Sequence, residues 1–238
     1  MYYNYKKTHS IVLLAMCDAN YTFTLVDIGA FGRQSDGGIF KNSRMGQRFV
    51  QGKIHVPPAD EIYEGSSEYP YVIVGDEAFP LSSYLIRPYP GREGLSIEKK
   101  VFNYRLYRAR RMIENTFGIL AAQWRIYRKS TIAKVDTVEK IEKMVKATAV
   151  LHNWLRKQDI TRRGTFITPE MVDRETNDGS IIPGTWRNMV ETNNSVLQNI
   201  AACSNHTYSR EAANIRIKFT EYFNEEGAVP WQFVRIHQ

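Results

Sequence analysis

Cysteine is scarce in this chain, and its two cysteines lie far apart. Cys17 and Cys203 are separated by most of the 238 residues, and no Cys-x-x-Cys spacing occurs. A disulfide framework needs several cysteines, and a zinc site needs closely spaced cysteine or histidine pairs. Neither is therefore indicated, and the cysteine content fits a reducing compartment.

Long apolar runs, internal repeats and low-complexity tracts are also missing. A membrane-spanning helix needs about 20 consecutive apolar residues, and no segment approaches that length. We therefore expect no membrane association. With 43% hydrophobic and 12% aromatic residues, the chain has the composition of a globular protein that can bury one sizeable core, or a core with a smaller appendage.

Positive charge is abundant and is concentrated in one stretch. The net charge is +7 and the pI about 9.3. Between Arg92 and Lys129 ten basic residues face three acidic ones, so this stretch alone carries a charge of +7. A charge run is usually the solvated face of a helix. A basic surface is also what binds nucleic-acid phosphates, and both interpretations stay open.

The hydrophobic pattern predicts both strands and helices. Residues 9–17 and 21–27 are typical of a β-hairpin, and residues 71–75 of a buried strand that is apolar on both faces. A helix start is expected at Ser35-Asp36. Apolar residues recur at helical spacing in three further segments, 97–122, 137–157 and 209–224. The stripe of residues 137–157 is most simply core.

Two carboxylates, Asp76 and Glu114, are the candidate chemical groups. Asp76 follows the strand 71–75, and Glu114 lies inside the arginine-rich helix. Magnesium takes oxygen ligands and keeps positions open for phosphate, so such a pair suits metal-dependent chemistry on phosphodiesters. Each residue also has a simpler explanation. Asp76 could be a turn residue, and Glu114 could form an i to i+4 ion pair worth a few tenths of a kcal/mol.

Seven short segments occur in a fixed order along the chain. They are residues 2–7 (YYNYKK), 26–33 (VDIGAFGR), 35–40 (SDGGIF), 75–81 (GDEAFPL), 102–106 (FNYRL), 113–118 (IENTFG) and 222–232 (YFNEEGAVPWQ). In this order they resemble the PIF/Harbinger transposases and the Harbinger transposase-derived nucleases. The likeness covers most of residues 2–158.

This resemblance implies a fold, an activity and a cofactor. The implied fold is α/β, an RNase H-like mixed sheet with flanking helices, here with a C-terminal helical extension. The implied site is an Asp-Asp-Glu triad that holds two divalent metals, Mg²⁺ or Mn²⁺, for DNA cleavage. Asp76 matches the second aspartate of the triad and Glu114 its glutamate, which makes both of them expected catalytic residues and metal ligands.

The first aspartate of the triad has no match in this sequence. In the family it lies on a strand just before the Tyr-Tyr segment, so we expect that first, central strand to be missing and activity to be impaired. Three other aspartates could stand in for it. Asp18 fits a hairpin turn and Asp36 a helix N-cap. Asp27, at a predicted strand end, is the best of the three, although the resemblance places the aspartate elsewhere.

Other residues are assigned with their simpler alternatives. We expect Arg108 and Arg111 to flank Glu114 near phosphate, with Arg33 as a further phosphate contact. His152 is expected to be a hydrogen-bonded core histidine rather than a ligand or base. Trp124 could stack on DNA bases, but we expect it to pack where its helix ends.

We predict three segments: residues 1–158 as a nuclease domain incomplete at its N-terminus, 159–208 as a polar linker, and 209–238 as an amphipathic helix and tail. The predicted function is a transposase-derived, divalent-metal-dependent DNA endonuclease, located in the nucleus with the cytoplasm as a second location. By resemblance, the expected partners are DNA and a Myb/SANT-like DNA-binding protein. Two alternatives are a catalytically inactive domesticated protein that binds DNA or a partner, and a truncated gene model or degraded transposon copy.

Overall fold

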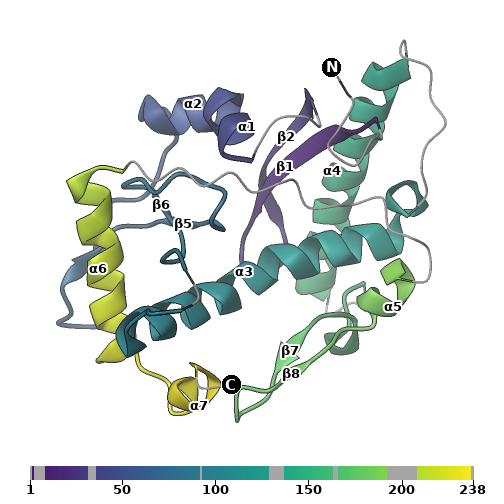
Figure 1. Ribbon diagram of the computed structural model, residues 1–238. Coiled ribbons are helices and arrows are strands. Elements are labelled where there is room, and N and C mark those ends of the chain that lie inside the picture. Colours follow the sequence, from purple (N-terminus) through teal and green to yellow (C-terminus); the bar gives the residue numbers. More distant parts are fainter. Residues whose placement is uncertain are drawn as a thin grey trace. The chain divides into compact units, whose positions relative to one another are not determined.

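The chain folds into two compact units, each with its own apolar core. The computed structural model describes residues 2, 9–31, 36–91, 93–128, 137–162, 166–191 and 208–236 (Figure 1). Unit 1 comprises residues 1–33 and 111–200, and unit 2 comprises residues 34–110 and 201–238. Helix α3 (Ile97–Gln123) contributes residues to both. The predicted boundaries at 158 and 208 stay a prediction.

A β-hairpin opens unit 1, as predicted. Strand β1 (Ile11–Cys17) pairs antiparallel with β2 (Phe23–Phe31). Between them, Oδ1 of Asp18 accepts hydrogen bonds from the backbone N–H groups of Asn20 (2.8 Å) and Thr22 (2.9 Å), an arrangement that favours a tight turn. Asp18 is therefore the turn residue that we expected.

Asp27 does not end its strand, contrary to the sequence-based expectation. Strand β2 continues to Phe31, and Asp27 lies opposite Leu14 in the middle of the hairpin. The strand runs on because Ile28 and Ala30 continue the pairing with β1. Helix α1 (Asp36–Asn42) begins at Asp36, where a helix start was predicted.

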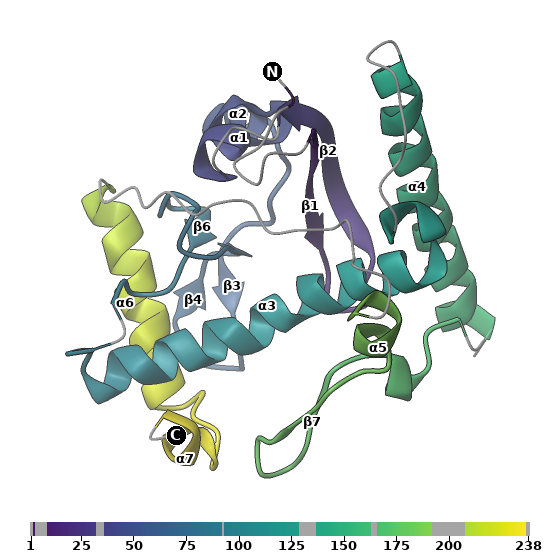
Figure 2. The same cartoon turned by 45° about the vertical axis from the view of Figure 1, so that its right-hand side comes forward.

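Helix α4 (Val138–Arg162) packs beside the hairpin in unit 1 (Figure 2). The side chain of Asn153 bonds in both directions to the backbone of Phe23, donating to its carbonyl at 2.7 Å and accepting from its N–H at 2.9 Å. Phe23 belongs to a buried cluster with Leu120, Ala121, Tyr127, Val145 and Ala149.

His152 and Trp124 have the structural positions that were expected. His152 is fully buried and hydrogen-bonded to the carbonyl of Tyr21. Trp124 follows the end of α3, precedes the short 3₁₀ helix η1 (Arg125–Tyr127), and packs against the unit 1 cluster.

The stretch expected to be a polar linker contains local structure in its described part. A 3₁₀ turn, η3 (Pro169–Met171), precedes a two-stranded hairpin of β7 (Arg174–Glu175) and β8 (Ile181–Ile182). A short helix, α5 (Trp186–Glu191), follows. These elements belong to unit 1.

Unit 2 combines short strands with helices. After α1 come α2 (Arg44–Val50), β3 (Asp60–Glu61), β4 (Glu68–Tyr69), β5 (Ile73–Val74) and β6 (Leu85–Ile86), and the chain returns with α6 (Arg210–Asn224) and α7 (Gln232–Ile236). Ser209 caps α6 by accepting from the N–H of Ala212 at 3.1 Å. The predicted helix 209–224 is thus confirmed. Its Ala212 packs into a core with Leu81, Ile86, Tyr89, Phe102 and Leu106.

The fold is mixed α/β, with small sheets and several helices. In the described ranges the strands form four two-stranded sheets, and only β5 and β6 pair in parallel. The predicted strand 71–75 is regular only at Ile73 and Val74. A continuous RNase H-like sheet stays a prediction. Each helix in the described part is too short or too polar to cross a membrane.

Candidate functional site

Asp76 lies in a tight turn directly after β5 in unit 2. Its Oδ1 accepts a hydrogen bond from the N–H of Ala78 at 2.9 Å, and its carbonyl accepts from the N–H of Phe79 at 3.2 Å. An aspartate that bonds to the backbone two residues later fixes the direction of its own side chain. The side chain is 36% exposed, so the carboxylate is held in place and is still reachable from solvent.

A buried arginine donates hydrogen bonds to the same turn. Nη1 of Arg87 donates to the carbonyls of Glu77 at 2.9 Å and Phe79 at 3.1 Å, and the residue is only 3% exposed. Burial lowers the pKa of Arg87, and the nearby positive charge of Arg216 lowers it further. Hydrogen bonds from a charged donor are stronger than those between neutral groups, so Arg87 makes the Asp76 turn rigid.

Helix α1 approaches the Asp76 turn closely because Gly37 has no side chain. A Cβ at Gly37 would lie 2.7 Å from the carbonyl oxygen of Ala78, which is closer than real Cβ contacts allow. The rings of Phe40 and Phe79 then meet edge to face, with centroids 5.9 Å apart. Residues 36–40 therefore pack directly against residues 75–81, and both belong to segments singled out in the sequence.

Arg110 is the basic residue closest to this carboxylate among the ion pairs of the described residues. Its Nη2 lies 3.7 Å from Oδ2 of Asp76, and its side chain is 25% exposed. This separation is too long for a good hydrogen bond, so the contact is a charge pair that a phosphate could share. Sequence reasoning favoured Arg108 and Arg111 and missed Arg110. The available signal was its position one helical turn before Glu114 on α3.

Arg108 and Arg111 have other contacts. The guanidinium of Arg108 lies 5.6 Å from the ring of Trp231 and 6.0 Å from that of Tyr104. Arg111 is 4% exposed, and its Nη1 lies 3.5 Å from Oε2 of Glu175. A phosphate would have to displace Glu175 to reach it. Their assignment as phosphate contacts stays a prediction, and Arg33 lies outside the described residues.

Glu114 lies half-buried on the unit 1 part of α3. Nearby residues of the same helix contact a segment that is distant in the sequence, residues 173–186. Asn115 is fully buried and bonds in both directions to the backbone of Asp173. Its Oδ1 also accepts from Nε1 of Trp186 at 3.1 Å. A Cβ at Gly118 would lie 2.2 Å from Cδ2 of Trp186, so glycine is required for that ring to pack there.

Asp173 is the charged centre of that segment. It is 4% exposed, and its Oδ1 accepts from the N–H of Gly184 at 2.8 Å and from Nε of Arg187 at 2.9 Å. Burial alone would raise the pKa of Asp173. The hydrogen bonds from Arg187 and Gly184, together with the charges of Arg187 and Arg111, lower it below its ordinary value instead.

Asp76 and Glu114 each offer a carboxylate that fits a single oxygen ligand of a hard cation. They belong to different units, unit 2 and unit 1. Among the residues that the structure describes, no group of three or more His, Cys, Asp or Glu side chains could hold a metal ion. Each of the two carboxylates therefore fits one ligand position of a metal centre.

Comparison with known proteins identifies the family. The sequence model of the DDE superfamily endonucleases matches residues 1–153, well over half of the chain. The chain belongs to the DDE superfamily endonucleases. The matched range includes both Asp76 and Glu114, and family membership makes a transposase-derived nuclease the coarse assignment.

One relative of this endonuclease domain is a plant protein. The chain is 27% identical over 154 residues to protein ALP1-like from Arabidopsis thaliana, which covers 62% of this chain and 36% of the relative. The chain thus spans about a third of the length of that relative. No solved structure matches the chain.

Proposed function

We propose that this chain is the DNA endonuclease domain of a PIF/Harbinger-type, transposase-derived protein, and that it depends on Mg²⁺ or Mn²⁺. One observation carries the proposal: the family match spans Asp76 and Glu114, and Asp76 presents a partly exposed carboxylate from a rigid turn beside Arg110. DNA as substrate follows from the endonuclease family.

The residues have distinct roles in this proposal. Asp76 and Glu114 would each supply an oxygen ligand. A bound divalent ion supplies Lewis-acid stabilisation of the charge that develops when a phosphodiester bond breaks. Arg110 would attract the phosphate oxygens, because its guanidinium is partly exposed and lies beside the Asp76 carboxylate. Arg87 would keep the Asp76 carboxylate oriented when the charge around it changes.

We expect weak cleavage by this chain, since two carboxylates bind a pair of metal ions poorly without a third. The alternative is a catalytically inactive protein that binds DNA or a protein partner. A Myb/SANT-like partner and a nuclear location are further parts of the proposal and rest on the resemblance alone.

A plasmid nicking assay tests the proposal. Purified protein is incubated with supercoiled DNA and either Mg²⁺, Mn²⁺ or EDTA, and the open-circular product is followed over time. We expect slow, metal-dependent nicking that Asp76→Asn and Glu114→Gln each reduce at least tenfold. Glu77→Gln is the matched control, because Glu77 is an exposed carboxylate adjacent to Asp76.

Three outcomes would change the conclusion. Nicking that persists in Asp76→Asn would show that this carboxylate is not a ligand. DNA binding without any cleavage, unchanged by EDTA, would support the inactive alternative. Rapid nicking by the unaltered chain would show that the site is more complete than the described residues indicate.

A further inference from the structure

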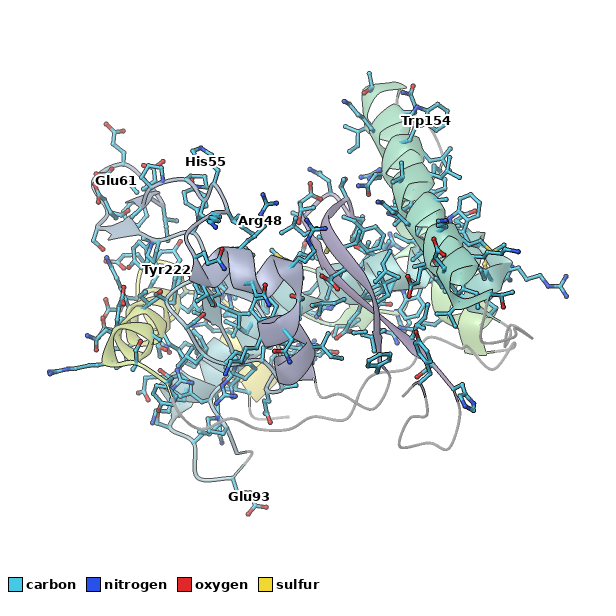
Figure 3. The ribbon with its side chains drawn as sticks, turned by 90° about the horizontal axis from the view of Figure 1, so that it is seen from above. Arg48, His55, Glu61, Glu93, Trp154 and Tyr222 are labelled. Atoms are coloured by element: carbon cyan, nitrogen blue, oxygen red, sulfur yellow. The ribbon has the colours of Figure 1, made fainter. Side chains whose placement is uncertain are left out.

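Helix α4 carries a second apolar stripe, on its solvent side. Met144 is 52% exposed, Leu151 43% and Trp154 57%. With the exposed Ala147 between them, these residues follow the alternating spacing of three and four that aligns side chains on one face of a helix. Val150, 61% exposed, widens the stripe. We call Met144, Ala147, Val150, Leu151 and Trp154 the outer stripe; Figure 3 labels Trp154 on α4.

The outer stripe is not the face by which α4 packs into the core. The other face of α4 is already buried, with Val145 6%, Ala149 3% and His152 0% exposed. At 100° per residue these positions lie opposite the outer stripe. The helix is therefore anchored on one side and presents a second apolar face on the other. Contiguous exposed apolar surface is typical of interaction sites.

Exposed lysines lie along α4 beside the outer stripe. Four lysines on α4 are exposed: Lys140, Lys143, Lys146 and Lys157. Among the exposed residues of α4 the one acidic side chain is Glu139, whose Oε1 lies 2.8 Å from Nζ of Lys143. The exposed charged residues of α4 are therefore mainly basic. A partner that matches this charge would carry acidic residues.

We propose that the outer stripe binds an amphipathic helix of a partner protein whose apolar seam is flanked by acidic residues. An apolar seam would pack on Met144, Leu151 and Trp154, while its acidic flanks would meet the lysines. Tryptophan is among the residues that most often contribute strongly to binding at protein interfaces. This site is independent of the proposed nuclease function.

Charge argues against a second copy of the chain on this face. A two-fold interface places the same patch against itself, which would bring one set of lysines against another. Like charges across an interface oppose association. Single-stranded nucleic acid is also disfavoured, because its binding relies on a series of aromatic rings that stack on successive bases, and Trp154 is the one aromatic member of the outer stripe. Met144, Val150 and Leu151 provide aliphatic surface with no hydrogen-bonding group.

The test uses two synthetic helical peptides as probes. Both have the same leucine seam; one has glutamate and the other lysine at all flanking positions. Fluorescence anisotropy of the labelled peptides measures binding at physiological salt. We expect the glutamate peptide to bind at least tenfold more tightly than the lysine peptide. Trp154→Ala and Leu151→Ala should each weaken it at least tenfold.

Two controls make the result specific. Ile160→Ala alters an apolar residue of α4 that is 51% exposed but lies off the outer stripe, and it should leave binding unchanged. The double variant Lys140→Glu with Lys157→Glu should reverse the preference between the two peptides. Circular dichroism verifies that every variant keeps its helix content.

Other outcomes would overturn the proposal. Equal binding of both peptides, or binding that Trp154→Ala leaves unchanged, would remove the case for a specific acidic helix. Sedimentation velocity that detects a dimer, lost in Trp154→Ala, would identify a second copy as the occupant. Displacement of the glutamate peptide by a single-stranded oligonucleotide, with tight oligonucleotide binding that needs Trp154, would identify nucleic acid instead.

Discussion

Asn115 and Asp173 are joined by two reciprocal hydrogen bonds. Nδ2 of Asn115 donates to the carbonyl oxygen of Asp173 at 3.2 Å, and Oδ1 of Asn115 accepts from the N–H of Asp173 at 3.0 Å. A side-chain amide thus replaces a strand partner for a buried backbone segment. The residue next to the candidate ligand Glu114 is therefore structural, whatever Glu114 does.

Replacing Asn115 by alanine should destabilise unit 1. The buried N–H and C=O of Asp173 would lose their partners, and each buried unsatisfied group costs about 1–3 kcal/mol. We expect the free energy of unfolding to fall by about 2–4 kcal/mol, measured by urea denaturation. An unchanged free energy of unfolding in Asn115→Ala would contradict the structural role.

Gly118→Ala tests the packing of Trp186 on α3. In an open helix this change stabilises by up to about 1 kcal/mol, because alanine is the better helix former. Here the new methyl group would lie 2.2 Å from Cδ2 of Trp186, and overpacking costs about 1–3 kcal/mol. We therefore expect a loss of stability in thermal or urea unfolding.

A double-mutant cycle isolates the contact with Trp186. In a Trp186→Ala background the clash is absent, so Gly118→Ala should be neutral or stabilising. The two changes should then couple by more than about 1 kcal/mol, as contacting residues do. Additive effects would show that Trp186 does not occupy the space beside Gly118.

Local patterns predicted the elements well, because periodicity and capping are read over a few residues. The helix expected at 97–122 runs from Ile97 to Gln123, and the one expected at 209–224 begins after the cap Ser209. The hairpin is likewise confirmed. In each case the deciding interactions lie within one element or between sequential strands.

What the sequence could not predict depends on contacts between distant segments. Asn115 meets Asp173 across 58 residues and Trp186 across 71. Asn103 and Asn153 make the same reciprocal clamp to the backbones of Tyr89 and Phe23. An asparagine on a helix has the same local pattern whether it clamps a distant backbone or faces solvent.

Helix α4 illustrates a second limit. Leu151 was expected in the core stripe, but it is 43% exposed, whereas Val145 and Thr148 are buried. The helix is apolar on two faces, and periodicity alone cannot tell which face meets the rest of the protein. For the same reason, periodicity could not decide which of Arg108, Arg110 and Arg111 faces the candidate site. The rotation of a helix about its own axis is set by tertiary packing.

Arg87→Met tests whether Arg87 makes the Asp76 turn rigid. The substitution removes the charged donor to the carbonyls of Glu77 and Phe79. The N–H of Ala78, which donates to Asp76, should then open more often. We expect its hydrogen exchange, measured by NMR, to accelerate at least tenfold.

Arg216→Met is the matched control for Arg87→Met. Both arginines are buried, and their positive charges repel each other. Either substitution therefore relieves the same repulsion. Of the two arginines, Arg87 is the one that donates to the carbonyls of Glu77 and Phe79. Faster exchange at Ala78 in both variants would attribute the rigidity of the turn to the packing of unit 2 as a whole.

His152 should make the stability of unit 1 depend on pH. Its Nε2 donates to the carbonyl of Tyr21 at 2.8 Å, and Nδ1 is buried without a hydrogen-bond partner in the described part of the chain. Burial lowers the pKa of His152 below its ordinary value of 6.5, and Arg156 lowers it further, although the bond to Tyr21 opposes the shift. Protonation would place a second N–H donor where no acceptor is present among the described residues.

The direction of the pH effect follows from that lowered pKa. Below pH 6.5 the unfolded chain takes up a proton at His152 before the folded chain does. Stability is therefore complete above pH 6.5 and falls as the pH drops toward the folded pKa, with a slope of at most about 1.4 kcal/mol per pH unit. His152→Gln keeps a donor for Tyr21 and does not titrate. Its free energy of unfolding, measured by urea titrations between pH 5 and 7.5, should vary less with pH than that of the unaltered protein. Parallel pH profiles would show that His152 titrates alike in both states.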